Sequence, residues 1–130
     1  DAGAMDREAS AVLARLKVVL PKLDAPVALM SGGQRQAIAV ARASAFARKV
    51  VLLDEPTAAL GLREARKVLD LIGQLKAEGN AVILITHNLE HVIELADRAV
   101  VLRQGRKVGE LEPSRANQQQ LVSMIVGAEI

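Results

Sequence analysis

The sequence contains no cysteine, tryptophan or tyrosine, and its single aromatic residue is Phe46. Without cysteine, the chain has no disulfide, no cysteine-ligated zinc and no thiol nucleophile. One aromatic residue is too few for a platform that stacks nucleic-acid bases. The 17 basic and 15 acidic residues nearly balance and are scattered, which argues against a nucleic-acid surface. We therefore expect an aliphatic core and no nucleic-acid partner.

Long hydrophobic runs are also missing. No apolar run approaches the roughly 20 residues that a membrane-spanning helix needs, and no signal-peptide pattern opens the chain. The 130 residues, of which 51% are hydrophobic, suit one compact domain. Composition alone predicts a soluble, cytoplasmic protein.

The first part of the chain has helical periodicity. Apolar residues at helical spacing predict one helix over residues 5–20 and a second over about 34–48. Pro21 and Pro26 mark a connector between them. We expect residues 1–48 to form a helical subdomain.

The second part alternates strands and helices. Val50–Leu53 and Ala81–Ile85 are short aliphatic runs typical of parallel strands buried on both faces. Between them, apolar residues predict a helix that ends near Gly79; its expected inward residues are Leu62, Ala65, Val68, Leu69, Ile72 and Leu75. This order predicts a right-handed crossover and an α/β fold over residues 49–130. A hairpin around Gln104-Gly105 and a final helix capped by Asn117 would complete it.

Reactive side chains follow both predicted core strands. Asp54 and Glu55 end the first strand, and His87 follows the second. In an open α/β sheet, ligands bind beyond the carboxyl ends of the strands. Asp54 could therefore bind Mg²⁺ directly or through water, while Glu55 polarises an attacking water. Alternatively, the two acids simply begin a turn before Pro56.

Ser31-Gly32-Gly33-Gln34 also allows two interpretations. Ser31 and Gln34 fit a capping box that starts a helix. The same helix start would offer unpaired N–H groups to an anion, and the glycines would let that anion approach the backbone. As an isolated motif, the tetrapeptide fits both interpretations.

The order of the motifs resembles that of the ATP-binding cassette (ABC) ATPases. MSGGQRQ at residues 30–36 resembles their signature motif, with Met30 where leucine is usual. VVLLDEP at residues 50–56 resembles their Walker B strand, and LITHN at residues 84–88 resembles their switch-histidine segment. The resemblance spans about residues 29–110. It implies a partial P-loop NTPase fold, in which a helical signature lobe precedes parallel strands, crossover helices, a hairpin and a final helix.

The resemblance assigns the signature residues to a nucleotide held by another subunit. Ser31, Gly32 and Gly33 would contact the γ-phosphate of ATP on the opposite subunit, and Gln34 would shape their loop.

The resemblance also assigns the residues after the strands. Asp54 would serve the Mg²⁺ site, and Glu55 would act as catalytic base. His87 would contact the γ-phosphate and hold the attacking water. Phosphoryl transfer depends chiefly on positioning and charge neutralisation, which these groups supply.

The implied parent is the ATP-hydrolysing subunit of an ABC transporter, peripheral on the inner face of the cell membrane. Its partners would be a second nucleotide-binding subunit, transmembrane permease subunits and, indirectly, a substrate-binding protein. Gly61, where the family commonly has aspartate, and the tail LVSMIVGAE resemble the carbohydrate-importer branch. We therefore expect bacterial sugar import.

The sequence lacks the phosphate-binding loop G-x-x-x-x-G-K-[ST]. The resemblance is thus to the C-terminal half of a nucleotide-binding domain, and we expect this chain alone to be inactive. In the family fold we expect the phosphate-loop strand between the two strands identified here. Its absence would leave exposed strand edges, which favour association or strand exchange.

Two alternatives accompany this interpretation. One is a truncated, non-catalytic cassette that only binds a partner. The other is a zinc metalloprotease, because residues 87–91 (HNLEH) match H-x-x-E-H. That motif needs both histidines on one helix, whereas His87 follows a predicted strand; we expect His91 to be a solvated helix residue.

Overall fold

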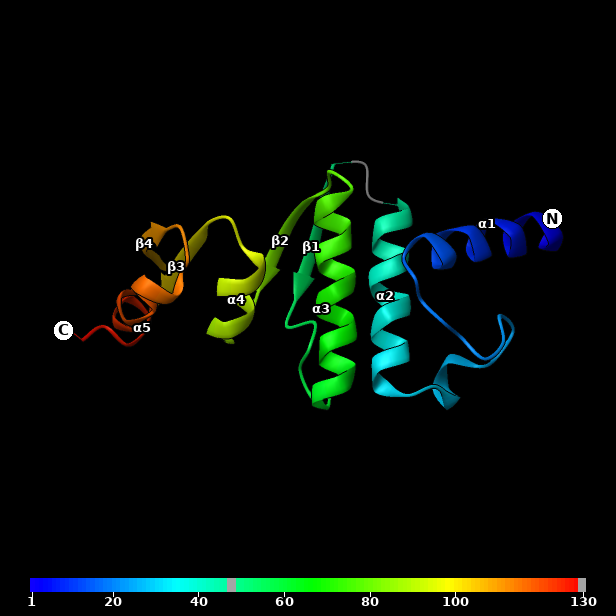
Figure 1. Cartoon of the computed structure of the whole chain (residues 1–130), viewed down its shortest axis with the longest axis horizontal. Coiled ribbons are helices and arrows are strands. Elements are labelled where there is room, and N and C mark those ends of the chain that lie inside the picture. Colours follow the sequence, from blue (N-terminus) through cyan, green and yellow to red (C-terminus); the bar gives the residue numbers. More distant parts are fainter. Residues whose placement is uncertain (47–48, 129–130) are drawn as a thin grey trace. The chain divides into compact units, whose positions relative to one another are not determined.

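The computed structural model describes residues 1–46 and 49–128. Packing divides the chain into two compact units, Asp1–Ile85 and Thr86–Ile130, rather than the single domain expected from its length (Figure 1). Each unit is described separately. The expected boundary between a helical subdomain at 1–48 and a core part at 49–130 stays a prediction.

The first unit contains α1 (Ala2–Arg15), the 3-10 turn η1 (Val27–Leu29), α2 (Gly32–Phe46), β1 (Val50–Asp54), α3 (Leu62–Ala77) and β2 (Ala81–Ile85). The predicted elements are all present, although the first helix ends five residues before Leu20. It stops where Lys17 adopts a positive φ of 55°. The last predicted residue of the second helix, Arg48, lies outside the described residues.

The two strands of this unit form a parallel pair. β1 and β2 run in register from Val50 opposite Ala81 to Asp54 opposite Ile85. The predicted parallel crossover is therefore confirmed. The expectation of a further strand between them is wrong, because β1 and β2 hydrogen-bond directly to each other.

Only one face of this sheet is covered within the unit. Val51 and Leu53 are buried beneath α2 and α3, which contact β1 and β2 respectively. On the other face Leu52, Ile83 and Ile85 are 67%, 52% and 53% exposed. Burial on both faces was predicted and is wrong for this chain, because no described element of the unit packs on the second face.

The core of the first unit lies between α2 and α3, which are neighbours in Figure 1. Its fully buried side chains include Val40, Val68 and Leu75. The predicted inward position of Leu62 is wrong: this side chain is 92% exposed, at the first position of α3, where no described element covers it. The predicted stop at Gly79 is confirmed, because its φ of +89° ends the helical turn.

The second unit contains α4 (Leu89–Leu95), β3 (Ala99–Arg103), β4 (Arg106–Leu111), the 3-10 turn η2 (Arg115–Asn117) and α5 (Gln118–Val126). β3 and β4 form the predicted antiparallel hairpin. Its two turn residues, Gln104 and Gly105, have φ values of 50° and 74°, as a tight hairpin turn requires. Leu121 of α5 and Val101 of β3 form the buried centre of this unit.

The predicted cap on α5 is wrong. The Asn117 side chain makes no capping bond to α5. It instead accepts a 2.8 Å hydrogen bond from the Ser114 N–H and donates a 2.7 Å bond to the Glu112 carbonyl. The Asn117 side chain therefore stabilises the turn that precedes α5 and does not cap the helix.

Candidate functional site

The tetrapeptide Ser31-Gly32-Gly33-Gln34 starts α2 as a capping box. The Ser31 N–H donates to Gln34 Oε1 at 3.0 Å, and the Gln34 N–H donates to Ser31 Oγ at 3.1 Å. The helical ladder begins with the Arg35 N–H bonded to the Ser31 carbonyl at 3.0 Å. The capping interpretation is therefore confirmed in detail.

The same geometry leaves two backbone donors unused. Within residues 1–46 and 49–128, no hydrogen bond occupies the N–H of Gly32 or Gly33. Both lie in the first turn of a 15-residue helix, where the helix dipole is positive. Ser31 beside them is exposed. The first turn of α2 thus has the donors and the charge that suit a phosphate oxygen.

The glycines are packed against the segment that follows β1. A Cβ added to Gly32 would lie 3.3 Å from Leu60 Cδ2. A Cβ added to Gly33 would lie 2.9, 3.0 and 3.1 Å from the Cβ, Cγ and Cδ of Glu64. Any side chain at Gly33 would therefore collide with the first turn of α3.

Asp54 and Glu55 lie at the carboxyl end of β1, as predicted. Asp54 is the last residue of the strand, is exposed and sits opposite Ile85. Glu55 is half-buried, has a φ of 46°, and donates its N–H to the Ile85 carbonyl at 2.8 Å. A non-glycine residue in this backbone region is uncommon and costs free energy, so surrounding structure must hold it there. The hydrogen bond to Ile85 is one such restraint.

The donor chemistry around Asp54 fits Mg²⁺ through a carboxylate oxygen. No three His, Cys, Asp or Glu side chains of the described residues form a group that could enclose a metal by themselves. Mg²⁺ commonly keeps several waters and takes one or two carboxylates together with substrate phosphates. Asp54 fits that open type of site.

His87 lies in the second unit, between the end of β2 and the start of α4. It is exposed and precedes Asn88, whose side chain caps α4 by accepting from the N–H groups of Glu90 and His91. His91 is half-buried rather than solvated. Since only His91 is on the helix, the two histidines lack the shared helix that the H-x-x-E-H chemistry requires.

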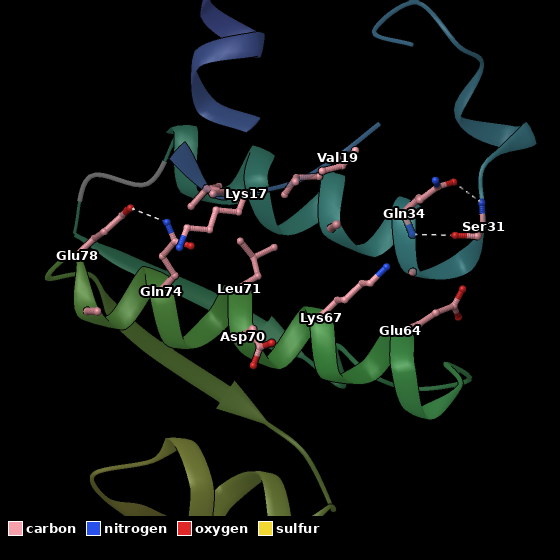
Figure 2. Close-up of a pocket in the computed structure, with 15 residues that line it drawn as sticks. Lys17, Val19, Ser31, Gln34, Glu64, Lys67, Asp70, Leu71, Gln74 and Glu78 are labelled. Atoms are coloured by element: carbon pink, nitrogen blue, oxygen red, sulfur yellow. Dashed lines mark hydrogen bonds between the residues drawn. The ribbon is translucent and has the colours of Figure 1, made fainter. Parts of the chain in front are cut away.

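A cavity of about 840 Å³ lies along the contact of α2 and α3. Ser31, Gly33 and Gln34 line one end, together with Glu64 and Lys67 of α3, and Figure 2 shows these two side chains on the side of α3 that faces the signature loop. Sequence reasoning missed Glu64 and Lys67. Helical periodicity marks both as polar positions of α3 and carries no information about contact with α2.

The chain is similar to known proteins in both sequence and fold. The family model described as ABC transporter matches residues 3–58. The fructose import ATP-binding protein FrcA of Rhizobium meliloti is 43% identical over 130 residues, covering 99% of this chain and 50% of that protein. The xylose/arabinose import ATP-binding protein XylG of Sulfolobus acidocaldarius is 42% identical over 121 residues, covering 93% of this chain and 48% of that protein.

A ribose import ATP-binding protein, RbsA 1 of Rubrobacter xylanophilus, is 42% identical over the whole chain, which covers 26% of that protein. The chain therefore spans about half the length of FrcA and XylG and about a quarter of this RbsA. Solved structures show the same partial coverage.

MJ1267, an ATP-binding cassette of an ABC transporter, superposes with a TM-score of 0.80 at 25% identity, over 95% of this chain and 49% of that one. CbiO1 of Clostridium perfringens, part of the ABC transporter complex cbiONQ, superposes with a TM-score of 0.73 at 25% identity, over 97% and 49%. Both neighbours support an α/β, partial P-loop NTPase fold. The chain is homologous to the sugar-import ATP-binding proteins of ABC transporters and corresponds to part of an ABC transporter ATPase domain.

Proposed function

We propose that this chain supplies the signature loop, the Mg²⁺-site carboxylate and the catalytic base of an ATPase that energises sugar import. The observation that carries the proposal is the pair of unused N–H groups of Gly32 and Gly33 at the start of α2. Together with the Ser31 hydroxyl, they suit the γ-phosphate of ATP held by an opposite subunit.

Asp54 and Glu55 have separate roles at a second ATP molecule, which is not the one that this chain's signature loop contacts. Mg²⁺ supplies charge neutralisation on the phosphates when bound, and Asp54 holds it directly or through water. Glu55 accepts a proton from the attacking water, and its backbone bond to Ile85 keeps it at the end of β2. By the resemblance, His87 would contact the γ-phosphate and hold the attacking water.

The partners follow from the same assignment. The ATPase would work as a dimer of nucleotide-binding subunits attached to transmembrane permease subunits, with a substrate-binding protein delivering the sugar. It would lie in the cytoplasm at the inner face of the membrane. No described helix is long and apolar enough to cross a membrane. The sugar class rests on the names of the relatives, which import fructose, xylose or arabinose, and ribose.

This chain would not hydrolyse ATP by itself. Its sequence has no G-x-x-x-x-G-K-[ST] loop, so it lacks the phosphate cradle and the lysine of a P-loop. The exposed apolar face formed by Leu52, Ile83 and Ile85 suits a chain that packs against a partner. A non-catalytic cassette that only binds a partner is the second candidate, favoured by the same two observations.

A hybrid tests the proposal. In this hybrid cassette, the present chain replaces the matching half of the Rhizobium meliloti relative and is joined to the part of that protein with which it does not align. We expect Mg²⁺-dependent ATP hydrolysis by the hybrid cassette and none by the chain alone. A folded hybrid that binds ATP without hydrolysing it would favour the non-catalytic candidate.

A further inference from the structure

The packing of α3 against the signature loop leaves no room for a side chain at position 33. The carboxyl carbon of Glu64 lies 3.1 Å from the position of a Gly33 Cβ, and its own Cβ lies at 2.9 Å. Rotation about the side-chain bonds can move the carboxyl group but leaves the Glu64 Cβ where it is. Position 33 is therefore closed to any side chain for as long as α3 keeps its place.

The contact is made by packing rather than by charge. The described residues offer the Glu64 carboxylate no hydrogen bond and no ion pair. Glu64 is half-buried and, with Lys67, borders the end of the cavity formed by Ser31 and Gln34 (Figure 2). Its methylene groups cover the backbone of Gly33, so an uncharged side chain of the same shape should serve equally well.

The contact also links the chain's two groups of candidate residues, the signature loop and the residues that follow β1, which serve different ATP molecules in the proposed function. Glu64 stands nine positions after Glu55 and belongs to the first turn of α3. Leu60, in the turn between these two residues, lies beside Gly32, where an added Cβ would be 3.3 Å from Leu60 Cδ2. The turn that carries the candidate base thus leads directly into the two side chains that cover the signature glycines.

We propose that Glu64 is a positioning residue that holds the Gly32–Gly33 backbone in the orientation in which its N–H groups meet a phosphate. This rests on the proposed ATPase function, whereas the packing contact itself can be tested apart from it. Loss of the Glu64 side chain frees the first turn of α2 and weakens ATP binding without removing a group that touches ATP.

A double-mutant cycle on thermal unfolding of the hybrid cassette tests the contact. Gly33 has no left-handed φ, so Gly33→Ala should stabilise a helix that has room for the methyl group. We expect Gly33→Ala to lower the unfolding midpoint by about 3 °C when Glu64 is present and to raise it in a Glu64→Gly background. Gly61→Ala is the control, because a Cβ there meets nothing within 4 Å; its effect should be equal in both backgrounds.

ATP titrations of the same protein test the positioning role. We expect Glu64→Ala to raise the half-saturating ATP concentration about fivefold or more, and Glu64→Gln to stay within about twofold of the parent. Arg63→Ala, at an exposed neighbouring position, should change nothing.

The outcomes separate the two proposals. Equal loss in Glu64→Ala and Glu64→Gln would overturn the packing account, as would no loss in either. An active hybrid cassette in which Gly33→Ala shifts the unfolding midpoint in the same direction in both backgrounds would also overturn it. A sign reversal in a hybrid that hydrolyses no ATP would support the contact while the proposed function fails.

Discussion

The Glu55 N–H donates a 2.8 Å hydrogen bond to the Ile85 carbonyl, so the candidate base is tied to the last residue of the neighbouring strand. This bond continues the β1–β2 ladder one residue beyond Asp54 while Glu55 has already turned to a φ of 46°. Asp54 remains in the strand, and Glu55 leaves it. The change of backbone direction gives the two adjacent residues different positions, as the separate roles proposed for them require.

Replacing Glu55 with glutamine should separate binding from hydrolysis. The amide keeps the size of the side chain but cannot accept a proton from water. In the hybrid cassette, we expect Glu55→Gln to retain ATP binding and to lower turnover by about 100-fold or more. Steady-state phosphate release and equilibrium nucleotide binding measure the two effects. Glu8→Gln, on exposed α1, is the matched control, and unimpaired turnover in Glu55→Gln would exclude Glu55 as the base.

Gly127 should be intolerant of alanine. Its φ is +81°, and an added Cβ would meet the Arg103 guanidinium, whose Nη1 donates to the Met124 carbonyl at 3.2 Å. We expect Gly127→Ala to reduce the free energy of unfolding by about 1–2 kcal/mol, measured by urea denaturation. In an Arg103→Met background, the substitution should still lose the stability that depends on the positive φ, but not the part that depends on the contact with the guanidinium. Equal costs in both backgrounds would mean that the guanidinium moves aside freely.

Glu110 should titrate at lower pH than an unperturbed glutamate. The Lys107 ammonium, which donates a hydrogen bond to Glu110, lowers the pKa of that carboxyl, and Arg98 lowers it further. Because the folded pKa is depressed, the pair contributes stability above the unfolded pKa and loses it as pH falls through the folded pKa. An NMR titration should show this lowered pKa, and Lys107→Met should raise it. A Glu110 pKa that does not respond to Lys107→Met would contradict the assignment.

The isolated chain should associate through its uncovered sheet. Leu52, Ile83 and Ile85 form an apolar face beside unpaired strand edges, a combination that favours strand pairing between molecules. We expect light scattering to show oligomers of the chain alone, and fewer of them for Leu52→Lys. Leu62→Lys, at an exposed position away from the sheet, should not reduce association. A monomeric sample of the unmodified chain that unfolds cooperatively would contradict this expectation.

The local elements could be predicted because their signals are local. The capping box of Ser31 and Gln34, the stop at Gly79 and the turn at Gln104-Gly105 each follow from neighbouring residues. The parallel pairing also follows, since one crossover helix joins two aliphatic runs.

What could not be predicted depends on contacts distant in sequence. The continuous aliphatic runs at Val50–Leu53 and Ala81–Ile85 predict a sheet covered on both faces. Whether the second face is covered depends on other elements, about which these runs carry no information. The position of Asn117 predicts a helix cap, but its side chain is hydrogen-bonded to the Ser114 N–H and the Glu112 carbonyl instead. Glu64 resembled an ordinary solvated helix residue, and only the packing of α2 on α3 places it over Gly33. The role assigned to His87 stays a prediction from the resemblance.

The central claim is that Ser31 and Glu55 of one chain serve two different ATP molecules. It is tested most directly by mixing two inactive hybrid cassettes, one carrying Ser31→Arg and the other Glu55→Gln, and measuring ATP hydrolysis. If each site joins the signature loop of one subunit to the base of the other, half of the dimers regain one intact site, and activity should return to about a quarter of the parent's. The double variant Ser31→Arg/Glu55→Gln should leave its mixed dimers with the parent inactive. A mixture of the single variants that stays inactive, while mixed dimers of the double variant hydrolyse ATP, would contradict the claim.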